Sequence, residues 1–198
     1  VYFRSKMSKA LDQVYIATCD NDIREYAQKI GAPCIMTLDT HDRATDRAAE
    51  AMVKIEKLTD KTIDIVVMIQ GDEPMLVPQM IDEAIAPLLL DSSILVANLM
   101  APLKSRKDQV DPNAVKVVVD LKNFALYFSR EPIPSIKKNG LDAPVMKQVP
   151  IIPFRRDFLI TFNSLAPTPL EITESVDMMR LLEHGYKVKM VPIKLEPY

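Results

Sequence analysis

Apolar and polar positions along the chain form blocks that predict strands and helices in turn. From Ile65 to Ile69 every residue is apolar, without the alternation of period two that marks a half-exposed strand. Such a run predicts a strand buried on both faces, as at the centre of a parallel sheet. Gln70, Gly71, two acids and Pro74 follow, and they predict a tight turn directly after the strand.

The first half of the chain alternates short strands with helices. Strands are predicted at 14–18 and 32–37, and Asp20 is a typical N-cap for a helix between them. Apolar residues at helical spacing predict a second helix from Thr45, and Pro78 suits the first turn of a third. This alternation predicts an α/β domain with a mostly parallel sheet.

The second half contains more strands and fewer helices. Thr168 as a cap, Pro169 at the first position and an acid in the first turn predict one helix, which Gly185 ends. A shorter helix is predicted at 155–162. Strands are predicted at 93–100, 115–119, 125–130 and 186–193, and a polar loop at 137–140.

Composition fits a single globular domain and argues against several functions. The 198 residues are 48% apolar and 26% charged, with a net charge of −2. Without a basic excess, a nucleic-acid partner is not indicated, and no apolar run is long enough to predict a membrane span. Two cysteines are too few for a disulfide scaffold, so we expect the reducing cytoplasm as the setting.

Asp72 and Glu73 are the strongest local candidates for chemistry. They follow the buried strand, and a sheet covered on both faces binds ligands at the carboxyl ends of its strands. Carboxylates there suit a hard cation such as Mg²⁺, which shares its remaining positions with phosphates and water. Alternatively, both acids cap the following turn and helix, and the local pattern leaves the two interpretations open.

Other polar residues favour structural roles. His184 near a helix C-terminus, and Glu171 and Glu174 near its N-terminus, complement the helix dipole. Arg155-Arg156 is expected to cover a surface, and His41 stands alone in a polar loop. Four glycines are too few for a dinucleotide fingerprint or a Walker motif, and no nucleophile with a histidine and an acid can be assembled.

The segment Gln70-Gly71-Asp72-Glu73-Pro74 resembles the hallmark of the CMP-Kdo synthetases, the 3-deoxy-manno-octulosonate cytidylyltransferases. The resemblance is collinear over essentially the whole chain. It implies a Rossmann-like three-layer nucleotidyltransferase fold with a mostly parallel mixed sheet, built by residues 1–198 as one cytidylyltransferase-like domain. The further segments that carry it are Ile16-Ala17-Thr18 with Asp20, Thr45-Asp46-Arg47, 111–118, 125–130 with Pro132-Ile133-Pro134, 154–159, 168–171 and 182–185.

The resemblance also implies an activity. CTP and a 3-deoxy-2-keto sugar acid (Kdo or a related acidic sugar) would give a CMP-sugar and pyrophosphate, for lipopolysaccharide or capsule precursors, in a homodimeric enzyme. Catalysis of such a transfer rests mainly on positioning and charge neutralisation. Asp72 would hold Mg²⁺, and Gln70 and Arg130 would contact the sugar acid. Thr45 and Arg47 would line the cytidine pocket.

Several positions depart from the family's usual pattern. Arg43-Ala44 stands where the family usually has Ser-Gly. The family's usual His, Tyr, Glu and Gln around the sugar are replaced here by Gln148, Ile152, Asp177 and Met178. Because a site built on hydrogen bonds discriminates strongly between ligands, these replacements imply a divergent member that binds a related acidic sugar.

The ends of the chain predict a fragment. The family's N-terminal triphosphate loop and its C-terminal metal-ligand segment have no counterpart in the 198 residues, and we expect this stretch alone to be inactive. Two alternatives to the transferase stay open. One is a Mg²⁺-dependent sugar phosphatase with Asp72 as nucleophile, and the other is a non-catalytic or degenerate nucleotide-binding paralogue.

Overall fold

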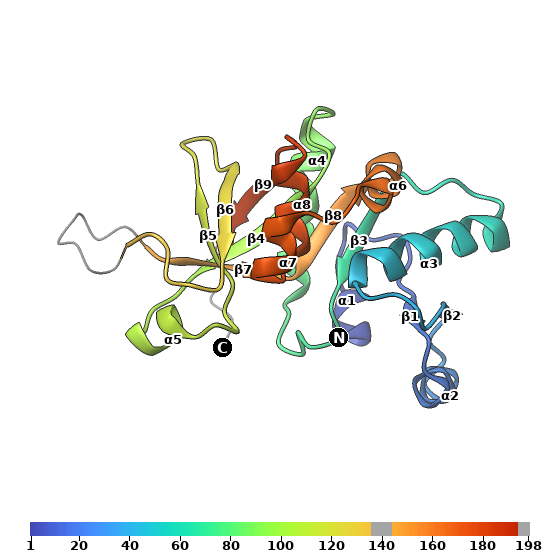
Figure 1. Ribbon diagram of the computed structural model, residues 1–198. Coiled ribbons are helices and arrows are strands. Elements are labelled where there is room, and N and C mark those ends of the chain that lie inside the picture. The colour runs from blue at the N-terminus through green and yellow to red at the C-terminus, as the bar shows by residue number, and fades with distance from the viewer. Residues whose placement is uncertain (136–143, 194–198) are drawn as a thin grey trace.

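A computed structural model describes residues 1–135 and 144–193 (Figure 1), so the predicted loop at 137–140 lies outside the described part. Its helices are α1 (Tyr2–Ser5), α2 (Asn21–Lys29), α3 (Ala44–Thr59), α4 (Pro78–Leu90), α5 (Arg106–Val110), α6 (Arg156–Ser164), α7 (Pro169–Glu174) and α8 (Asp177–Glu183). Its strands are β1 (Ile16–Thr18), β2 (Cys34–Met36), β3 (Ile65–Ile69), β4 (Ala97–Pro102), β5 (Lys116–Val119), β6 (Ala125–Ser129), β7 (Met146–Val149), β8 (Ile151–Arg155) and β9 (Lys189–Pro192).

The larger sheet has the strand order β6-β5-β7-β4-β9, and β3 pairs with β8. β8 follows β7 directly after Pro150, and a bridge between Val96 and Phe154 ties it to the segment that leads into β4. In Figure 1, β4 and β8 cross the middle of the molecule, and the parallel pair β1–β2 lies apart beside α2.

Helices cover both faces of this sheet. Neighbouring residues of a strand point to opposite faces. Leu99 of β4 and Ile151 of β8 pack in one core cluster with residues of α4, whereas Met100 and Ile152 pack in another with residues of α6 and α8. The predicted three-layer α/β arrangement with a mixed sheet is therefore confirmed.

The expectation that parallel pairs predominate is wrong for the described strands. There, β1–β2 and β4–β9 are parallel, whereas β3–β8, β4–β7, β5–β6 and β5–β7 are antiparallel. β3 lies beside antiparallel β8, and Met68 is the one fully buried residue among its five. The apolar run therefore does not report the direction of the neighbouring strand, and of the burial predicted on both faces only that of Met68 is complete, since the other four residues are partly exposed. The pattern also hides β7 and β8, because prolines at 150 and 153 interrupt it.

Local signals set the starts of the first helices. Asp20 caps α2, since its Oδ1 accepts from the backbone N–H of Asp22 at 2.7 Å and of Ile23 at 3.2 Å. Pro78 occupies the first turn of α4, as predicted. The short helix α5, which Ser105 caps, is not predicted by the pattern because it carries no buried face.

The helix predicted from Thr168 to Gly185 is instead two helices, α7 and α8. Ser175 ends α7 with a φ of 51°, in the left-handed region. Val176 and Met179 continue the apolar spacing across the break, so the pattern does not reveal it. The junction of the two helices comprises residues 174–177. It lies between the start of α3 and the end of β6.

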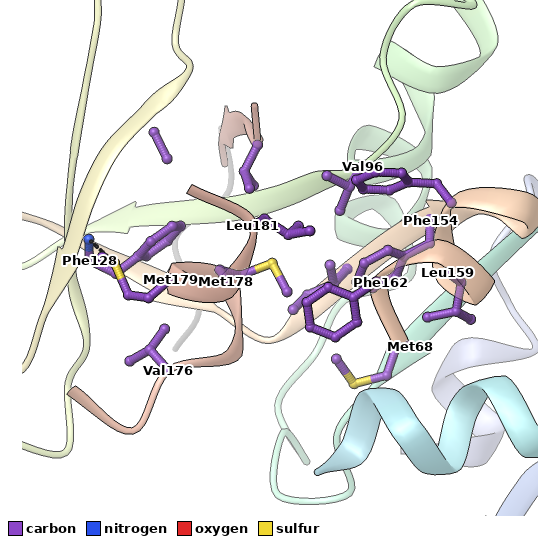
Figure 2. Packing of buried hydrophobic residues seen from close by; sticks show 14 of the residues in the cluster. Met68, Val96, Phe128, Phe154, Leu159, Phe162, Val176, Met178, Met179 and Leu181 are labelled. Carbon is purple, nitrogen blue, oxygen red and sulfur yellow. Dashed lines mark hydrogen bonds between the residues drawn. The ribbon is translucent and has the colours of Figure 1, made fainter. Parts of the chain in front are cut away.

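The main core lies between the sheet and helices α6 and α8 (Figure 2). The rings of Phe154 and Phe162 lie 6.0 Å apart, and the sulfur of Met179 accepts a hydrogen bond from the Phe128 backbone N–H at 3.4 Å. Burial of this apolar surface stabilises the fold by about 25 cal/mol for each Å² removed from water. A membrane-spanning helix needs a long apolar stretch, and no helix in residues 1–135 and 144–193 has one.

Candidate active site

The acidic turn follows β3, as the sequence predicts. The backbone N–H of Gln70 donates to the Pro150 carbonyl at 3.4 Å, and the chain then turns so that Asp72 is exposed. Burial raises the pKa of the Glu73 carboxyl, the charge of Lys147 opposes this in part, and Asp72 adds to it. Two adjacent carboxyls at the end of a strand are thus present, one open to solvent and one half-buried.

The acidic turn offers few ligands by itself. In residues 1–135 and 144–193, no group of three or more His, Cys, Asp or Glu side chains is arranged to hold a metal ion. A hard cation that takes one or two carboxylates, and fills its other positions with phosphate oxygens and water, nevertheless fits such a turn. The carboxylates of Asp72 and Glu73 therefore suit a cation that is already bound to the phosphates of a ligand.

Arg130, at the end of β6, is held in place by backbone carbonyls. Its Nε donates to the Glu174 carbonyl at 2.7 Å, Nη1 to that of Pro112 at 2.8 Å, and Nη2 to that of Ser175 at 3.2 Å. A guanidinium has five N–H donors. These three bonds use three of the five N–H groups, which leaves one on each terminal nitrogen without a partner among the described residues and available to an anionic ligand such as a carboxylate.

Glu174 supports Arg130 from the other side. Its carboxylate accepts from the Tyr127 hydroxyl at 3.1 Å, the Ser129 hydroxyl at 3.0 Å and the Arg130 backbone N–H at 2.8 Å. Lys116 is fully buried beside this group and donates to the Arg130 carbonyl, and burial lowers the pKa of Lys116. Glu174 therefore connects the end of α7 to β6. The expectation that it complements the dipole at a helix N-terminus is wrong, because it is the last residue of α7.

The predicted nucleotide residues lie at the start of α3. Arg47 donates through Nη1 to the Thr37 hydroxyl and, at 3.2 Å, to the Leu38 carbonyl, which ties α3 to the segment after β2. The hydroxyl of fully buried Thr45 donates to Asp177 Oδ2 at 3.0 Å. The structure thus brings Thr45 and Asp177, two of the predicted site residues, into direct contact.

The other departures from the family's pattern lie on the sheet and on α8. Gln148 on β7 is partly exposed and lies opposite Met100 of β4. Ile152 and Met178 are 3% and 1% exposed and belong to the main core. Neither side chain lines an open site, because both fill the space between the sheet and α8. No hydrogen bond or ion pair within the described chain joins the side chains of Gln70 and Asp72 to the other predicted site residues.

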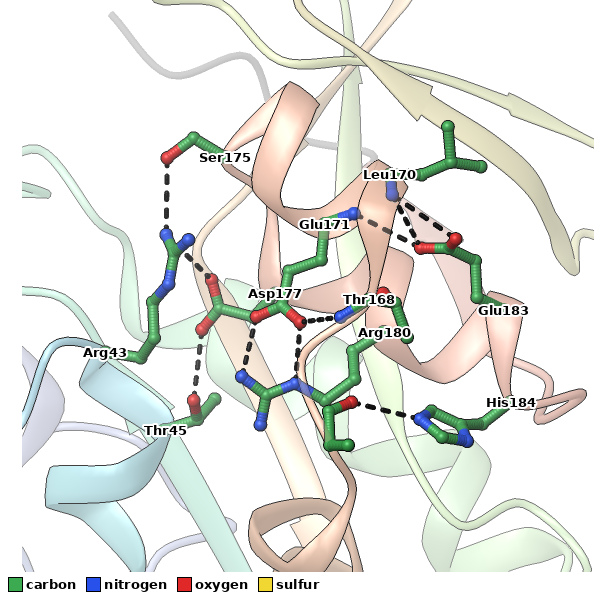
Figure 3. Close-up of polar contacts among 11 residues, drawn as sticks. Arg43, Thr45, Thr168, Leu170, Glu171, Ser175, Asp177, Arg180, Glu183 and His184 are labelled. Atoms are coloured by element: carbon green, nitrogen blue, oxygen red, sulfur yellow. Dashed lines mark hydrogen bonds and ion pairs between the residues drawn. The ribbon is translucent and has the colours of Figure 1, made fainter.

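Helices α7 and α8 are fixed to each other by buried polar contacts (Figure 3). Arg180 donates to the two carboxylate oxygens of Glu171 at 2.7 and 2.6 Å, and both side chains are almost fully buried. Glu183 accepts from the backbone N–H groups of Leu170 and Glu171 at 3.1 and 3.2 Å. The sequence assigns Glu171 to the helix dipole, but its main contact is this ion pair. His184 is the C-cap residue of α8, so its predicted place at a helix C-terminus is confirmed, and its Nε2 lies 3.1 Å from the Ala166 carbonyl, outside that helix.

The expectation that Arg155-Arg156 only covers a surface is wrong. Arg155 donates to backbone carbonyls at the end of α4 and beyond it, including that of Leu88 at 2.6 Å. Arg156 makes a two-point bond to Glu56 at 2.7 and 2.9 Å, which lowers the pKa of Glu56 to about 2. Both arginines are structural contacts between distant segments.

The loop before α3 contains contacts that the sequence does not reveal. Glu50 of α3 accepts from the Leu38 backbone N–H at 2.9 Å and also contacts His41. The hydrogen bond from Lys54 is the main cause that lowers the pKa of Glu50 to about 2. Arg43, the N-cap residue of α3, reaches Ser175 and Asp177. The only sequence signal for Arg43 is its place in a position that the family usually fills with Ser.

Comparison with known proteins places these features in a family. A family model described as Cytidylyltransferase matches residues 1–190. The chain is 39% identical over 206 residues to the 3-deoxy-manno-octulosonate cytidylyltransferase of Geobacter metallireducens, with 99% of this chain and 79% of that protein covered. It is 38% identical to the protein of the same name from Geotalea daltonii, with the same coverage.

Solved structures agree with these matches. A CMP:2-keto-3-deoxy-manno-octonic acid synthetase complexed with CTP matches with a TM-score of 0.87 and 33% identity, over 97% of this chain and 76% of that one. A cytidylyltransferase from Leptospira borgpetersenii, with a TM-score of 0.56 and 18% identity, shares the fold. The chain therefore belongs to the 3-deoxy-manno-octulosonate cytidylyltransferase family.

Proposed function

We propose that this protein transfers CMP from CTP to 3-deoxy-manno-octulosonate, or to a closely related 3-deoxy-2-keto sugar acid, with release of pyrophosphate. The names of its relatives support the reaction, and the structural relative bound to CTP supports the nucleotide. The observation that carries the proposal is Arg130, a fixed guanidinium with one N–H left on each terminal nitrogen. Such a fork matches a carboxylate, the group that distinguishes a sugar acid from a neutral sugar.

Mg²⁺ is the cofactor that we propose, held by Asp72 with Glu73 beside it. The exposed carboxylate of Asp72 is a hard oxygen ligand with no competing partner among the described residues. When bound, the ion supplies neutralisation of phosphate charge and polarisation of the reacting oxygens.

Positioning does most of the remaining work in this reaction. The anomeric oxygen of the sugar acid forms a bond to the α-phosphorus of CTP, the bond from that phosphorus to pyrophosphate breaks, pyrophosphate leaves with the bonding electron pair, and the proton of the hydroxyl passes to water. We assign the sugar carboxylate to Arg130 and a sugar hydroxyl to the Gln70 amide. Arg47 fixes the start of α3, where we place the nucleotide.

Pyrophosphate release tests the proposal in the whole protein, together with any residues that flank positions 1 and 198. We expect release to require CTP, Mg²⁺ and a 3-deoxy-2-keto sugar acid. A panel of such acids, with the amide of 3-deoxy-manno-octulosonate as a control that lacks the carboxylate, identifies the preferred substrate. CTP binding without turnover of any acid supports a non-catalytic paralogue. Phosphate release from a sugar phosphate without CTP supports a phosphatase. Either outcome overturns the proposal.

The homodimer, the cytoplasmic setting and the single domain over residues 1–198 stay predictions from the sequence.

A further inference from the structure

We propose that the junction of α7 and α8 couples nucleotide binding to sugar-acid binding, with Ser175 and Asp177 as positioning residues. The inference rests on the proposed function, which places the nucleotide at the start of α3 and the sugar carboxylate at Arg130. The junction holds these two halves of the site relative to each other.

The junction contacts the start of α3 through side chains (Figure 3). The Thr45 hydroxyl donates to Asp177 Oδ2 at 3.0 Å. Arg43 Nη1 donates to Ser175 Oγ at 3.3 Å and lies 4.0 Å from Asp177 Oδ1. Thr45 is fully buried, so water cannot easily replace its bond to Asp177. These contacts join segments that lie 132 residues apart in the sequence.

The same junction holds Arg130 through its backbone. The carbonyls of Glu174 and Ser175 accept from Arg130 Nε at 2.7 Å and from Nη2 at 3.2 Å. Ser175 thus binds Arg43 with its hydroxyl and Arg130 with its carbonyl. Its φ of 51° is uncommon for a residue other than glycine, and such a conformation persists where the surroundings hold it.

Coupling follows from this arrangement. The buried ion pair of Arg180 with Glu171 fixes α8 to α7, on either side of the junction. A nucleotide that shifts or rigidifies the start of α3 acts on Asp177 and Ser175, and these residues set the carbonyls that orient Arg130. By thermodynamic reciprocity, a sugar acid bound at Arg130 tightens nucleotide binding by the same factor.

The test compares carboxylates at the two ends of α8 in the whole protein. Calorimetry with Mg²⁺ measures the Kd of a CTP analogue with methylene between the α- and β-phosphorus, which prevents turnover, with and without saturating 3-deoxy-manno-octulosonate. In the wild type we expect the sugar acid to lower this Kd by about fivefold or more. Asp177→Ala should reduce the ratio to less than about twofold, whereas the control Glu183→Ala, which loses contacts only within α7 and α8, should keep it.

A second variant keeps the test informative if Asp177→Ala does not fold. Arg43 is partly exposed, and Arg43→Ala removes its contacts with Ser175 and Asp177 but leaves the Thr45 bond, so the ratio should fall part of the way. A wild-type ratio in Arg43→Ala and in a folded Asp177→Ala, in proteins that still release pyrophosphate, overturns the coupling and leaves the proposed function intact. A wild-type protein that binds no CTP analogue overturns the proposed function itself.

Discussion

The end of β6 and the turn after β3 belong to the same candidate site but are built in opposite ways. At the end of β6, Arg130 is fixed by the carbonyls of Pro112, Glu174 and Ser175. After β3, Asp72 is exposed, and its side chain makes no hydrogen bond within the described residues. One region is held by tertiary contacts before any ligand arrives, whereas the other is left open.

The difference follows from what each region has to bind. A guanidinium recognises a carboxylate through a planar fork, so its direction must be set in advance. A Mg²⁺ ligand shares its ion with the phosphates that arrive with it, so the protein can supply one carboxylate and leave the rest of the shell open. We therefore expect substitutions near Arg130 to lower both stability and activity. Substitutions in the acidic turn should lower the activity but not the stability.

The largest effect is expected for Arg130→Ala. The variant loses three hydrogen bonds from a charged group, which lowers the free energy of unfolding by about 3–4 kcal/mol. Pyrophosphate release with a sugar acid should fall by about 100-fold or more, because the carboxylate loses its charged partner. Urea unfolding and steady-state kinetics measure both quantities. The matched control is Arg156→Ala, which breaks the two-point bond to Glu56 and should cost stability without raising the KM for the sugar acid.

Asp72→Asn should affect activity alone. Removing the charge that holds Mg²⁺ should lower kcat by about 100-fold, or about 2.7 kcal/mol of transition-state stabilisation. The free energy of unfolding should stay within about 0.5 kcal/mol of the wild type, because the exposed side chain has no partner to lose. A Mg²⁺ titration of kcat and thermal unfolding check this, with Asp42→Asn, in another exposed loop, as control. Equal losses of kcat in the two aspartate variants would show that Asp72 does not hold Mg²⁺.

Features that depend on a few neighbouring residues could be predicted from the sequence. Asp20 and Pro78 start their helices as expected, because caps act within one turn. The break at Ser175 could not be predicted, since Val176 and Met179 keep the apolar spacing through it. The direction of strand pairing could not be predicted either, because β3 and its neighbour β8 are separated by more than eighty residues of sequence.

The candidate site shows the same limit. The acidic turn could be located because Asp72 directly follows its strand. The anchoring of Arg130 by Glu174 could not, because those residues lie 44 positions apart. Resemblance assigned Ile152 and Met178 to the sugar, but apolar side chains at these positions fill the core. A residue's place in a family's sequence pattern therefore does not show whether its side chain lines the site or packs in the core.

Glu174→Gln tests how far the support of Arg130 extends. The amide oxygen can still accept from the Tyr127 and Ser129 hydroxyls, but the amide NH2 then faces the backbone N–H of Arg130, so stability should fall by about 1–2 kcal/mol. The activity with a sugar acid should fall by about tenfold, which corresponds to about 1.4 kcal/mol. Glu131→Gln removes a charge close by from an exposed side chain and should leave both quantities unchanged. An unchanged activity in Glu174→Gln would mean that the backbone carbonyls alone orient Arg130.

The smallest effect has the opposite sign and concerns Glu73. Burial raises the pKa of its carboxyl in the folded protein. A group of this kind stabilises the fold fully below its ordinary pKa of 4.5, and that contribution is lost as the pH rises through the folded value. Glu73→Gln stays neutral at every pH, so it should raise the Tm at high pH by no more than about 2–4 °C and leave it unchanged below pH 4.5.

Thermal unfolding of Glu73→Gln and the wild type across this pH range, without and then with Mg²⁺, decides the point. Mg²⁺ that binds the folded state stabilises it in proportion to its affinity, so the wild type should recover the difference when the ion is added. A Tm difference that is independent of pH would trace the effect to packing. A difference in Tm that appears at high pH and disappears with Mg²⁺ would show that the charged Glu73 destabilises the fold when no cation is bound, and that binding of the cation removes this cost.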